Sequence, residues 1–229
     1  MQRQAAGRGG KGALLVGAIA SAAGFLTLAV MAARGELSDL DRGIHGLVQG
    51  ARHPLLGVAM QAVSTLGDHS GLVPLIVLGS VLLWRPRRRL ALILPGVMAG
   101  AGVLQLAAKW AIDRPRPNLD PWGFPSGHVL SLVVFLGLVC YVIGTSSYRR
   151  RWRHLGFGGC AGTLLAVAFS RLYLEAHWLS DVAGGFTVGL AYLLLVIVLV
   201  EAIGDRRARS DALEDRGVSP AARHSARSL

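Results

Sequence analysis

Three short groups of residues carry side chains suited to binding and transferring a phosphate group. The first is KWAIDRPRP at 109–117, which contains the cations Lys109 and Arg116. The second is PSGH at 125–128, and the third is SRLYLEAHWLSD at 170–181. Cations bind phosphate oxygens, histidines attack phosphorus or move protons, and a carboxylate can orient a histidine. The groups together predict phosphoryl-transfer chemistry.

The third group contains a histidine with a carboxylate partner. His177 and Asp181 are four positions apart, so on a helix they share one face. A carboxylate bound to one ring nitrogen fixes the tautomer and leaves the other nitrogen free to attack. A lone histidine at a membrane edge is usually an interfacial side chain. Here Ser170 and Arg171 precede it closely, which favours a catalytic pair.

The second group lies immediately before an apolar stretch. Ser126 after a proline is an ordinary helix N-cap. The same geometry also presents free backbone N–H groups and a partial positive charge to an anion. Gly127 would let the backbone approach closely, and His128 would stand beside the anion as a proton donor.

Apolar segments alternate with basic stretches along the chain, and they predict an all-α, integral membrane bundle of six transmembrane helices. The expected spans are 12–33, 70–84, 90–110, 128–147, 155–173 and 178–203. The apolar region of the first is too long for a cleaved signal peptide. With a cytoplasmic N-terminus, the basic stretches at 85–89, 148–154 and 206–209 all fall on the cytoplasmic side, as the positive-inside rule expects.

This topology puts all three groups at external ends of spans. Prolines and cations commonly close a helix, but the positive-inside rule disfavours Lys109 and Arg116 on the outer side. Phosphate binding supplies another reason to keep them there. We expect a multi-pass protein of the cell (inner) membrane, with its active site on the external, periplasmic side and both termini in the cytoplasm.

Outside the spans we expect a basic cytoplasmic N-terminus at 1–11, a transmembrane domain at 12–203 and a disordered basic tail at 204–229. Residues 34–69 are interpreted as an external, interfacial connection between the first two spans, because the apolar run 54–66 is short for a span. Its ionisable residues are expected to be solvated or to face headgroups: Asp39, Asp41, His45, His53, Asp68 and His69.

Composition excludes several classes of protein. The chain has 229 residues, 52% of them hydrophobic and only 16% charged, which is typical of a membrane protein. The formal charge of +11 sits in short runs between apolar stretches rather than in an aromatic-interleaved groove, so no nucleic-acid partner is expected. No metal-ligand spacing is present, and Cys140 and Cys160 are expected to be small hydrophobes.

The combined set resembles the type-2 phosphatidic acid phosphatase superfamily, whose three motifs occur here in the same order. All 11 signature positions are met: Lys109, Arg116, Pro117, Pro125, Ser126, Gly127, His128, Ser170, Arg171, His177 and Asp181. The resemblance implies that His177 forms a phosphohistidine, that Asp181 orients it and that His128 protonates the leaving oxygen. It also implies that the phosphate is held by Lys109, Arg116, Ser126, Gly127, Ser170 and Arg171.

These expectations leave the lipid open among a polyprenyl diphosphate, which is preferred, a phosphatidylglycerol phosphate and a phosphatidic acid. Three protein cations and a helix terminus can do the work of Mg²⁺, so neither a metal nor another cofactor is expected. Alternatives are a lipid phosphotransferase with the same nucleophile and a non-catalytic lipid-phosphate binding or transport protein. The spans argue against the soluble vanadate haloperoxidases of the same superfamily. Oligomeric state stays open.

Overall fold

Every regular element in the described part of the chain is a helix. The computed structural model describes residues 2–217, with side chains described over 10–206. The elements are α1 (Gln2–Ala33), α2 (Ser38–Gly50), α3 (Pro54–Ser64), the 3-10 turn η1 (Thr65–Gly67), α4 (His69–Trp84), α5 (Arg88–Ala111), α6 (Gly127–Gly144), α7 (Arg150–Tyr173) and α8 (Leu179–Gly217). The expected all-α class is confirmed.

Five helices in the described part are long and apolar enough to cross a bilayer: α1, α5, α6, α7 and α8. A sixth span is obtained if α3 with η1 and α4, which are bent by 48° at a short break, is counted as one. In α1, α5, α7 and α8 only 11–28% of the most apolar window is buried in the protein. So much exposed apolar surface suits contact with lipid, and the chain is an integral membrane protein.

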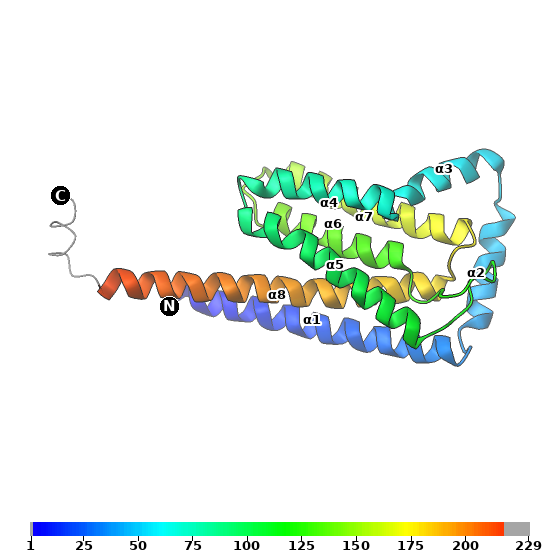
Figure 1. Cartoon of the computed structure of the whole chain (residues 1–229), viewed down its shortest axis with the longest axis horizontal. Helices are drawn as coiled ribbons and strands as arrows, with labels where there is room; N and C mark the ends of the chain where they lie inside the picture. Colours follow the sequence, from blue (N-terminus) through cyan, green and yellow to red (C-terminus); the bar gives the residue numbers. More distant parts are fainter. Residues whose placement is uncertain (1, 218–229) are drawn as a thin grey trace.

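The helices form a bundle in which α6 is central. Half of the residues in its most apolar window are buried, including Val129, Leu130 and Val134. Helices α1 and α8 run antiparallel along one side (Figure 1), and Lys11 near the start of α1 forms an ion pair of 2.5 Å with Asp205 far along α8. Helices α4, α5 and α7 complete the bundle around α6.

The connection between the first two spans is structured, and one expectation about it is wrong. Helix α2 crosses one end of the bundle (Figure 1), and α3 leads from it back to α4. Asp39 is exposed, as expected of a solvated residue, but Asp41 is only 1% exposed. Helix α2 therefore buries a carboxylate against the other helices, because Asp41 lies on the face that it turns towards them.

The expected tail also differs in part. Helix α8 continues beyond residue 203 to Gly217, so helix replaces the disorder expected at 204–217. Likewise α1 begins at Gln2, inside the expected N-terminal segment 1–11. Residues 218–229 lie outside the described residues.

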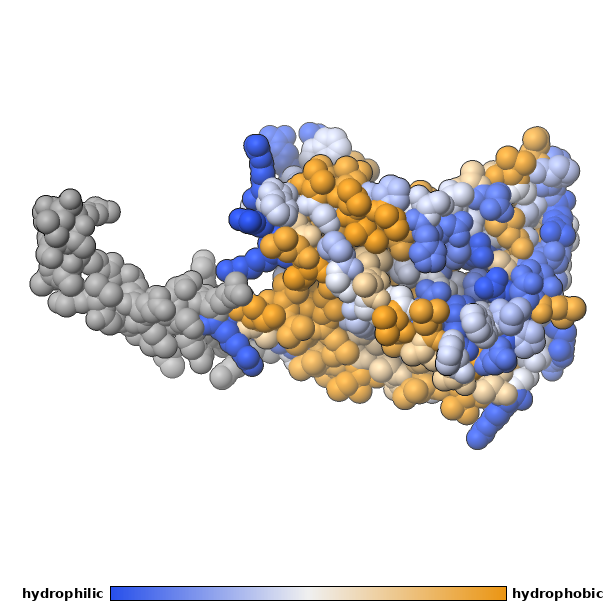
Figure 2. All heavy atoms as spheres, in the orientation of Figure 1, coloured by the Kyte–Doolittle hydropathy of each residue, from blue (hydrophilic) through white to orange (hydrophobic). Residues whose placement is uncertain are grey.

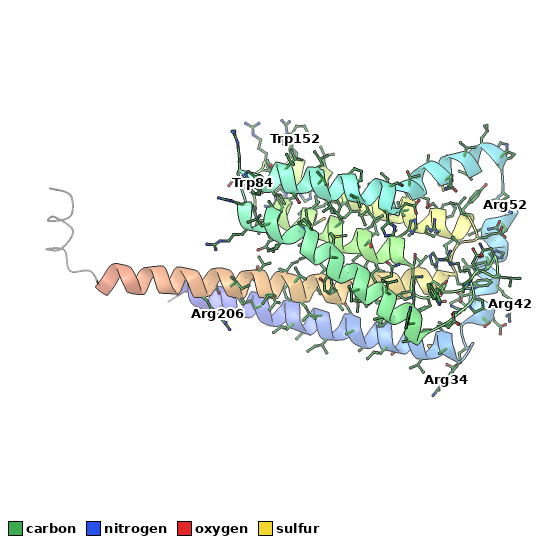
Figure 3. All side chains as sticks on the ribbon, in the orientation of Figure 1. Arg34, Arg42, Arg52, Trp84, Trp152 and Arg206 are labelled. Carbon is green, nitrogen blue, oxygen red and sulfur yellow. The ribbon has the colours of Figure 1, made fainter. Side chains whose placement is uncertain are left out.

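The two ends of the bundle carry different residues. Figure 2 shows hydrophobic atoms gathered over the middle of the molecule and hydrophilic atoms towards its ends. Trp84, Trp152 and Arg206 mark one end in Figure 3, beside the basic stretches. Arg34, Arg42 and Arg52 mark the opposite end, where α2 lies. The two ends are thus separated by an apolar belt, the arrangement expected of a protein that spans a bilayer.

Candidate active site

The three sequence groups meet at the end of the bundle crossed by α2. Lys109 lies in the last turn of α5, His128 in the first turn of α6 and Arg171 in the last turn of α7. His177 lies two residues before the start of α8, and Arg116 belongs to the loop between α5 and α6. Successive helices run in opposite directions, so the ends of α5 and α7 lie beside the starts of α6 and α8. Antiparallel packing therefore assembles one site from residues distant in sequence.

Six of the nine predicted site residues line one cavity of about 1410 Å³: Lys109, Arg116, Gly127, His128, Arg171 and His177. Ser126, Ser170 and Asp181 are fully buried, and none of them is among the lining residues. The Ser170 hydroxyl donates to the carbonyl of Val167 at 2.7 Å. The Ser126 hydroxyl has no hydrogen-bond partner among the described residues. The structure thus brings the cations and histidines together, and leaves the two serine hydroxyls off the cavity wall.

His177 and Asp181 are adjacent, although His177 lies outside the helix. The distance from His177 Nδ1 to Asp181 Oδ2 is 3.5 Å, longer than an ordinary hydrogen bond. Asp181 is fully buried, and its Oδ2 accepts the backbone N–H of Trp178 at 2.9 Å. The carboxylate therefore caps the start of α8 and faces Nδ1 of the imidazole. This leaves Nε2 as the ring nitrogen turned away from Asp181.

Burial sets the protonation state of His177. The side chain is 3% exposed, and this desolvation lowers its pKa from 6.5 to about 4. Asp181 opposes the shift, while the positive charges of Arg171 and Lys109 add to it. At neutral pH the ring is therefore uncharged, which is the form that can act as a nucleophile.

The cations around the cavity are held in different ways. Lys109 is buried and donates to the backbone carbonyl of Trp122. Arg171 Nη1 donates to the hydroxyl of Ser64, which is itself fully buried, at 2.5 Å. The Nε of Arg116 finds no partner among the described residues. The three cations give the cavity an excess of positive charge, which favours an anionic ligand.

A carboxylate that the sequence analysis assigned to solvent also lines the cavity. Asp68, between η1 and α4, has its Oδ1 2.7 Å from Nε2 of His128. Gly67 allows this approach, because a Cβ there would lie 2.7 Å from Cδ2 of the His128 ring. A signal for Asp68 was present in the sequence, since it stands at the external end of an expected span, as the three groups do.

A second group missed in the sequence lies behind Asp181. Arg114 Nη1 is 3.1 Å from Asp181 Oδ1, and Arg114 Nη2 is 2.7 Å from Asp41 Oδ2. Ser180 donates to Asp41 through its backbone N–H at 3.0 Å and through its hydroxyl at 2.6 Å. Two buried carboxylates thus share one guanidinium. No local pattern in the sequence links Asp41 to the third motif.

The cavity continues beyond the cations along the membrane-spanning helices. Its wall is formed by one face of α4 and one face of α5, and it reaches Trp84 and Arg85 at the opposite end of α4. The lining is mainly apolar along this part, and includes Leu72, Ile76 and Met98. A polar chamber at a helix end therefore opens into an apolar groove that runs through the depth of the bundle.

Comparison with known proteins identifies the family. The family model of the PAP2 superfamily matches residues 90–205, which contain all three sequence groups. The chain belongs to the PAP2 superfamily. Asp41 and Asp68 lie outside the matched residues, so the part of the chain that defines the family includes neither carboxylate.

Two curated PAP2 relatives are similar over different lengths. Phosphatidylglycerophosphatase B of Bacillus subtilis (strain 168) is 27% identical over 180 residues, which cover 75% of this chain and 89% of that protein. Lipid phosphate phosphatase delta of Arabidopsis thaliana is 27% identical over 143 residues, covering 55% of this chain and 34% of the plant protein. The chain thus spans about a third of the plant enzyme.

Solved structures agree on the fold. The crystal structure of the first transmembrane PAP2 type phosphatidylglycerolphosphate phosphatase from Bacillus subtilis has a TM-score of 0.75 and 26% identity, covering 81% of this chain and 96% of that one. Aquifex aeolicus LpxE has a TM-score of 0.54 at 22% identity, covering 70% and 94%. The family match and the similarity to the Bacillus subtilis phosphatase sequence and crystal structure show that this PAP2 protein is a membrane-embedded phosphatase.

Proposed function

We propose that this PAP2 protein hydrolyses the phosphate of a membrane lipid through a covalent intermediate on His177. One observation carries the proposal: the chamber with Lys109, Arg116 and Arg171 opens into the apolar groove of α4 and α5. A lipid phosphate needs both environments at once. Its headgroup would bind the cations at the helix ends, while its apolar chain stays in the groove.

In the first step, Nε2 of His177 attacks phosphorus and the bond from phosphorus to the lipid oxygen breaks. His128, which also lines the chamber, donates a proton to that leaving oxygen. Lys109, Arg116 and Arg171 stabilise the negative charge on the equatorial oxygens. Asp181 stabilises the charge that develops on the His177 ring. The products are a phosphohistidine and the lipid less one phosphate, which is a lipid monophosphate when the substrate is a diphosphate.

In the second step, water attacks phosphorus, the bond from phosphorus to Nε2 of His177 breaks, and inorganic phosphate leaves, which returns the enzyme to its starting state. His128 now lacks a proton and takes one from the water, so the two proton transfers balance. Asp68, 2.7 Å from His128, would hold the ring in place through both steps. The cations do the electrostatic work assigned to Mg²⁺ in other phosphoryl-transfer enzymes, so we expect activity to persist in a chelator.

Two lipid classes are the main candidates for the substrate. The groove extends along all of α4, whose 16 residues span about 24 Å at 1.5 Å per residue, more than one leaflet of a ~30 Å core. This length favours a polyprenyl diphosphate. Similarity to an enzyme named phosphatidylglycerophosphatase B supports a phosphatidylglycerol phosphate. Phosphatidic acid is the third candidate.

The test is phosphate release by purified protein in detergent with EDTA present, over a panel of these lipids and short soluble phosphate esters. We expect at least one long-chain lipid to be turned over faster than the soluble esters. The variant His177→Ala should lose activity by a factor on the order of 10³ or more, because the nucleophile is gone. Its affinity for the lipid should change little.

The matched control is His154→Ala, at the opposite end of the bundle, where the imidazole accepts a hydrogen bond from Nε of Arg150 at 3.1 Å. This variant should keep wild-type turnover. Near wild-type turnover by His177→Ala would show that His177 is not the nucleophile. Loss of activity in EDTA, restored by added metal, would contradict the cationic mechanism.

A further inference from the structure

Asp41 is a charged residue on an external helix that no sequence motif includes, yet it is 1% exposed. Its two oxygens accept three hydrogen bonds, from the backbone N–H and hydroxyl of Ser180 and from Arg114. Burying a carboxylate is costly unless its partners are all in place. Helix α2 therefore depends on a fixed arrangement of Arg114 and Ser180.

Both partners of Asp41 are also bound to the catalytic region. Arg114 Nη1 is 3.1 Å from Oδ1 of Asp181 and donates to the Ser180 hydroxyl at 2.5 Å. Ser180 directly precedes Asp181 in the first turn of α8. The Arg114 guanidinium also lies over the Trp178 ring, 5.9 Å from its centroid. Asp41 is thus connected to Asp181 in two ways, through Arg114, which contacts both carboxylates, and through Ser180, which is the neighbour of Asp181 in the chain.

The other end of α2 is fixed to the same catalytic segment. The amide of Gln49 donates to the carbonyls of Leu172 and Tyr173, at the end of α7, at 3.3 Å each. The backbone N–H of His53 donates to the Tyr173 hydroxyl at 2.7 Å. Helix α2 therefore holds the end of α7 and the start of α8, and His177 lies in the turn between them.

We propose that Asp41 is a positioning residue for the His177–Asp181 pair. The Arg114 guanidinium forms one ion pair with Asp41 and another with Asp181. Because its positive charge is shared, it offsets less of the negative charge of Asp181. More of the negative charge of Asp181 is then directed at His177, whose ring becomes positive on attacking phosphorus. Asp41 also fixes the first turn of α8 through Ser180. This inference rests on the proposed role of His177.

The first experiment compares Asp41→Asn with Asp39→Asn. Both changes remove one negative charge from α2, but the Asp39 side chain is 97% exposed and forms its ion pair with Arg42 on the same helix. We expect Asp41→Asn to lower kcat on the best lipid by a factor on the order of 10², because small misplacements of reacting groups are costly. The KM should change less than about threefold, since the phosphate-binding cations are untouched. Asp39→Asn should match wild type.

The second experiment asks whether Asp41 acts through Asp181. In the Asp181→Asn background, Asp41→Asn should cause little further loss of kcat, because the group it positions is already neutral. If Asp41 only stabilised the fold, the factors by which Asp41→Asn and Asp181→Asn each lower kcat would multiply in the double variant. Multiplying losses, a wild-type kcat for Asp41→Asn, or an equal loss for Asp39→Asn would each overturn the proposal.

The failures of the two proposals can be told apart. If His177→Ala is active, His177 is not the nucleophile and both proposals fail. If His177→Ala is inactive but Asp41→Asn is unaffected, only the positioning role of Asp41 fails. Hydrogen exchange over 176–182 gives a readout without turnover: Asp41→Asn should lose protection there and Asp39→Asn should not. If Asp41→Asn does not fold, Ser180→Ala removes one hydrogen bond to Asp41 and should lower kcat with KM unchanged. An unchanged kcat for Ser180→Ala would then overturn the proposal.

Discussion

His177 combines deep burial with a partner carboxylate, and the two effects on its charge are opposed. Desolvation lowers its pKa and Asp181 raises it, with desolvation the larger, so the pKa is about 4. A group with a lowered pKa is neutral above that value and protonated below it. The folded protein therefore keeps the His177 ring uncharged throughout the neutral range, as the proposed nucleophile requires, and protonates it only in acid.

The pH dependence of kcat/KM tests this protonation state. Since kcat/KM reports the free enzyme, we expect no change due to His177 between about pH 5 and 8, and a fall of roughly tenfold per pH unit below the pKa. The measurement is kcat/KM against pH in detergent, corrected for titration of the substrate phosphate. An acid limb at the ordinary histidine value of about 6.5 would show that burial does not dominate.

Between helices, glycines decide how closely α6 and α8 pack. A Cβ at Gly185 would lie 2.4 Å from the backbone oxygen of Ser126, and one at Gly189 would lie 3.0 Å from that of Leu130. Glycines four residues apart, as these two are, are typical of helices that approach closely, and both short distances agree with this. A Cβ at Gly158 or Gly162, at the same spacing in α7, would meet no group of a neighbouring helix within 4 Å in the described part of the chain. The contact at Gly185 also sets the position of the Ser126 turn beside Asp181.

Substitution of these glycines should separate packing from helix propensity. Gly185→Ala should lower the free energy of unfolding by about 1–3 kcal/mol, because the new methyl group meets backbone that cannot move without shifting α6. Gly158→Ala should leave it unchanged or raise it slightly, because alanine is the better helix former and its methyl group has open space. Thermal unfolding in one detergent checks both. Equal melting temperatures for Gly185→Ala and Gly158→Ala would mean that α6 and α8 can move apart at Gly185 without loss of stability.

Across the whole molecule, the candidate active site and the basic stretches lie at opposite ends. Lys109 and Arg171 end their helices beside α2, whereas Trp84 and Trp152 mark the end that holds the basic stretches (Figure 3). The positive-inside rule then puts the basic end in the cytoplasm and the catalytic end outside. This assignment of sides is a prediction, because the fold alone is the same in either orientation.

Cysteine labelling tests the assignment of sides. In a background with Cys140→Ser and Cys160→Ser, we expect Arg42→Cys to react with a membrane-impermeant thiol reagent added to intact cells. Trp152→Cys should react only after the membrane is opened. The extent of labelling before and after permeabilisation is the measurement. The reverse pattern would place the site on the cytoplasmic side.

The meeting of the motif residues at one end of the bundle could be predicted because each motif is short and stands at the end of a helix. Lys109, Arg116, His128, Arg171 and His177 each stand at or beside the end of an apolar segment, and helices that cross a bilayer must alternate in direction. This alternation by itself brings the helix ends that carry these residues to one side of the membrane. The lengths of the apolar segments likewise predict the all-helical fold, since a spanning segment must satisfy its backbone hydrogen bonds internally.

The sequence by itself therefore determined the family of reactions and the helical class, and six of the nine site residues predicted from it line the polar chamber. Only the tertiary structure decided the place of Asp41 and Asp68. Each carboxylate looks like a solvated residue in its own segment, and becomes part of the site through partners 60 or more positions away, Arg114 and Ser180 for Asp41 and His128 for Asp68. Local patterns record periodicity and capping, but the burial of a charge depends on which helices pack together, and packing is a property of the whole fold.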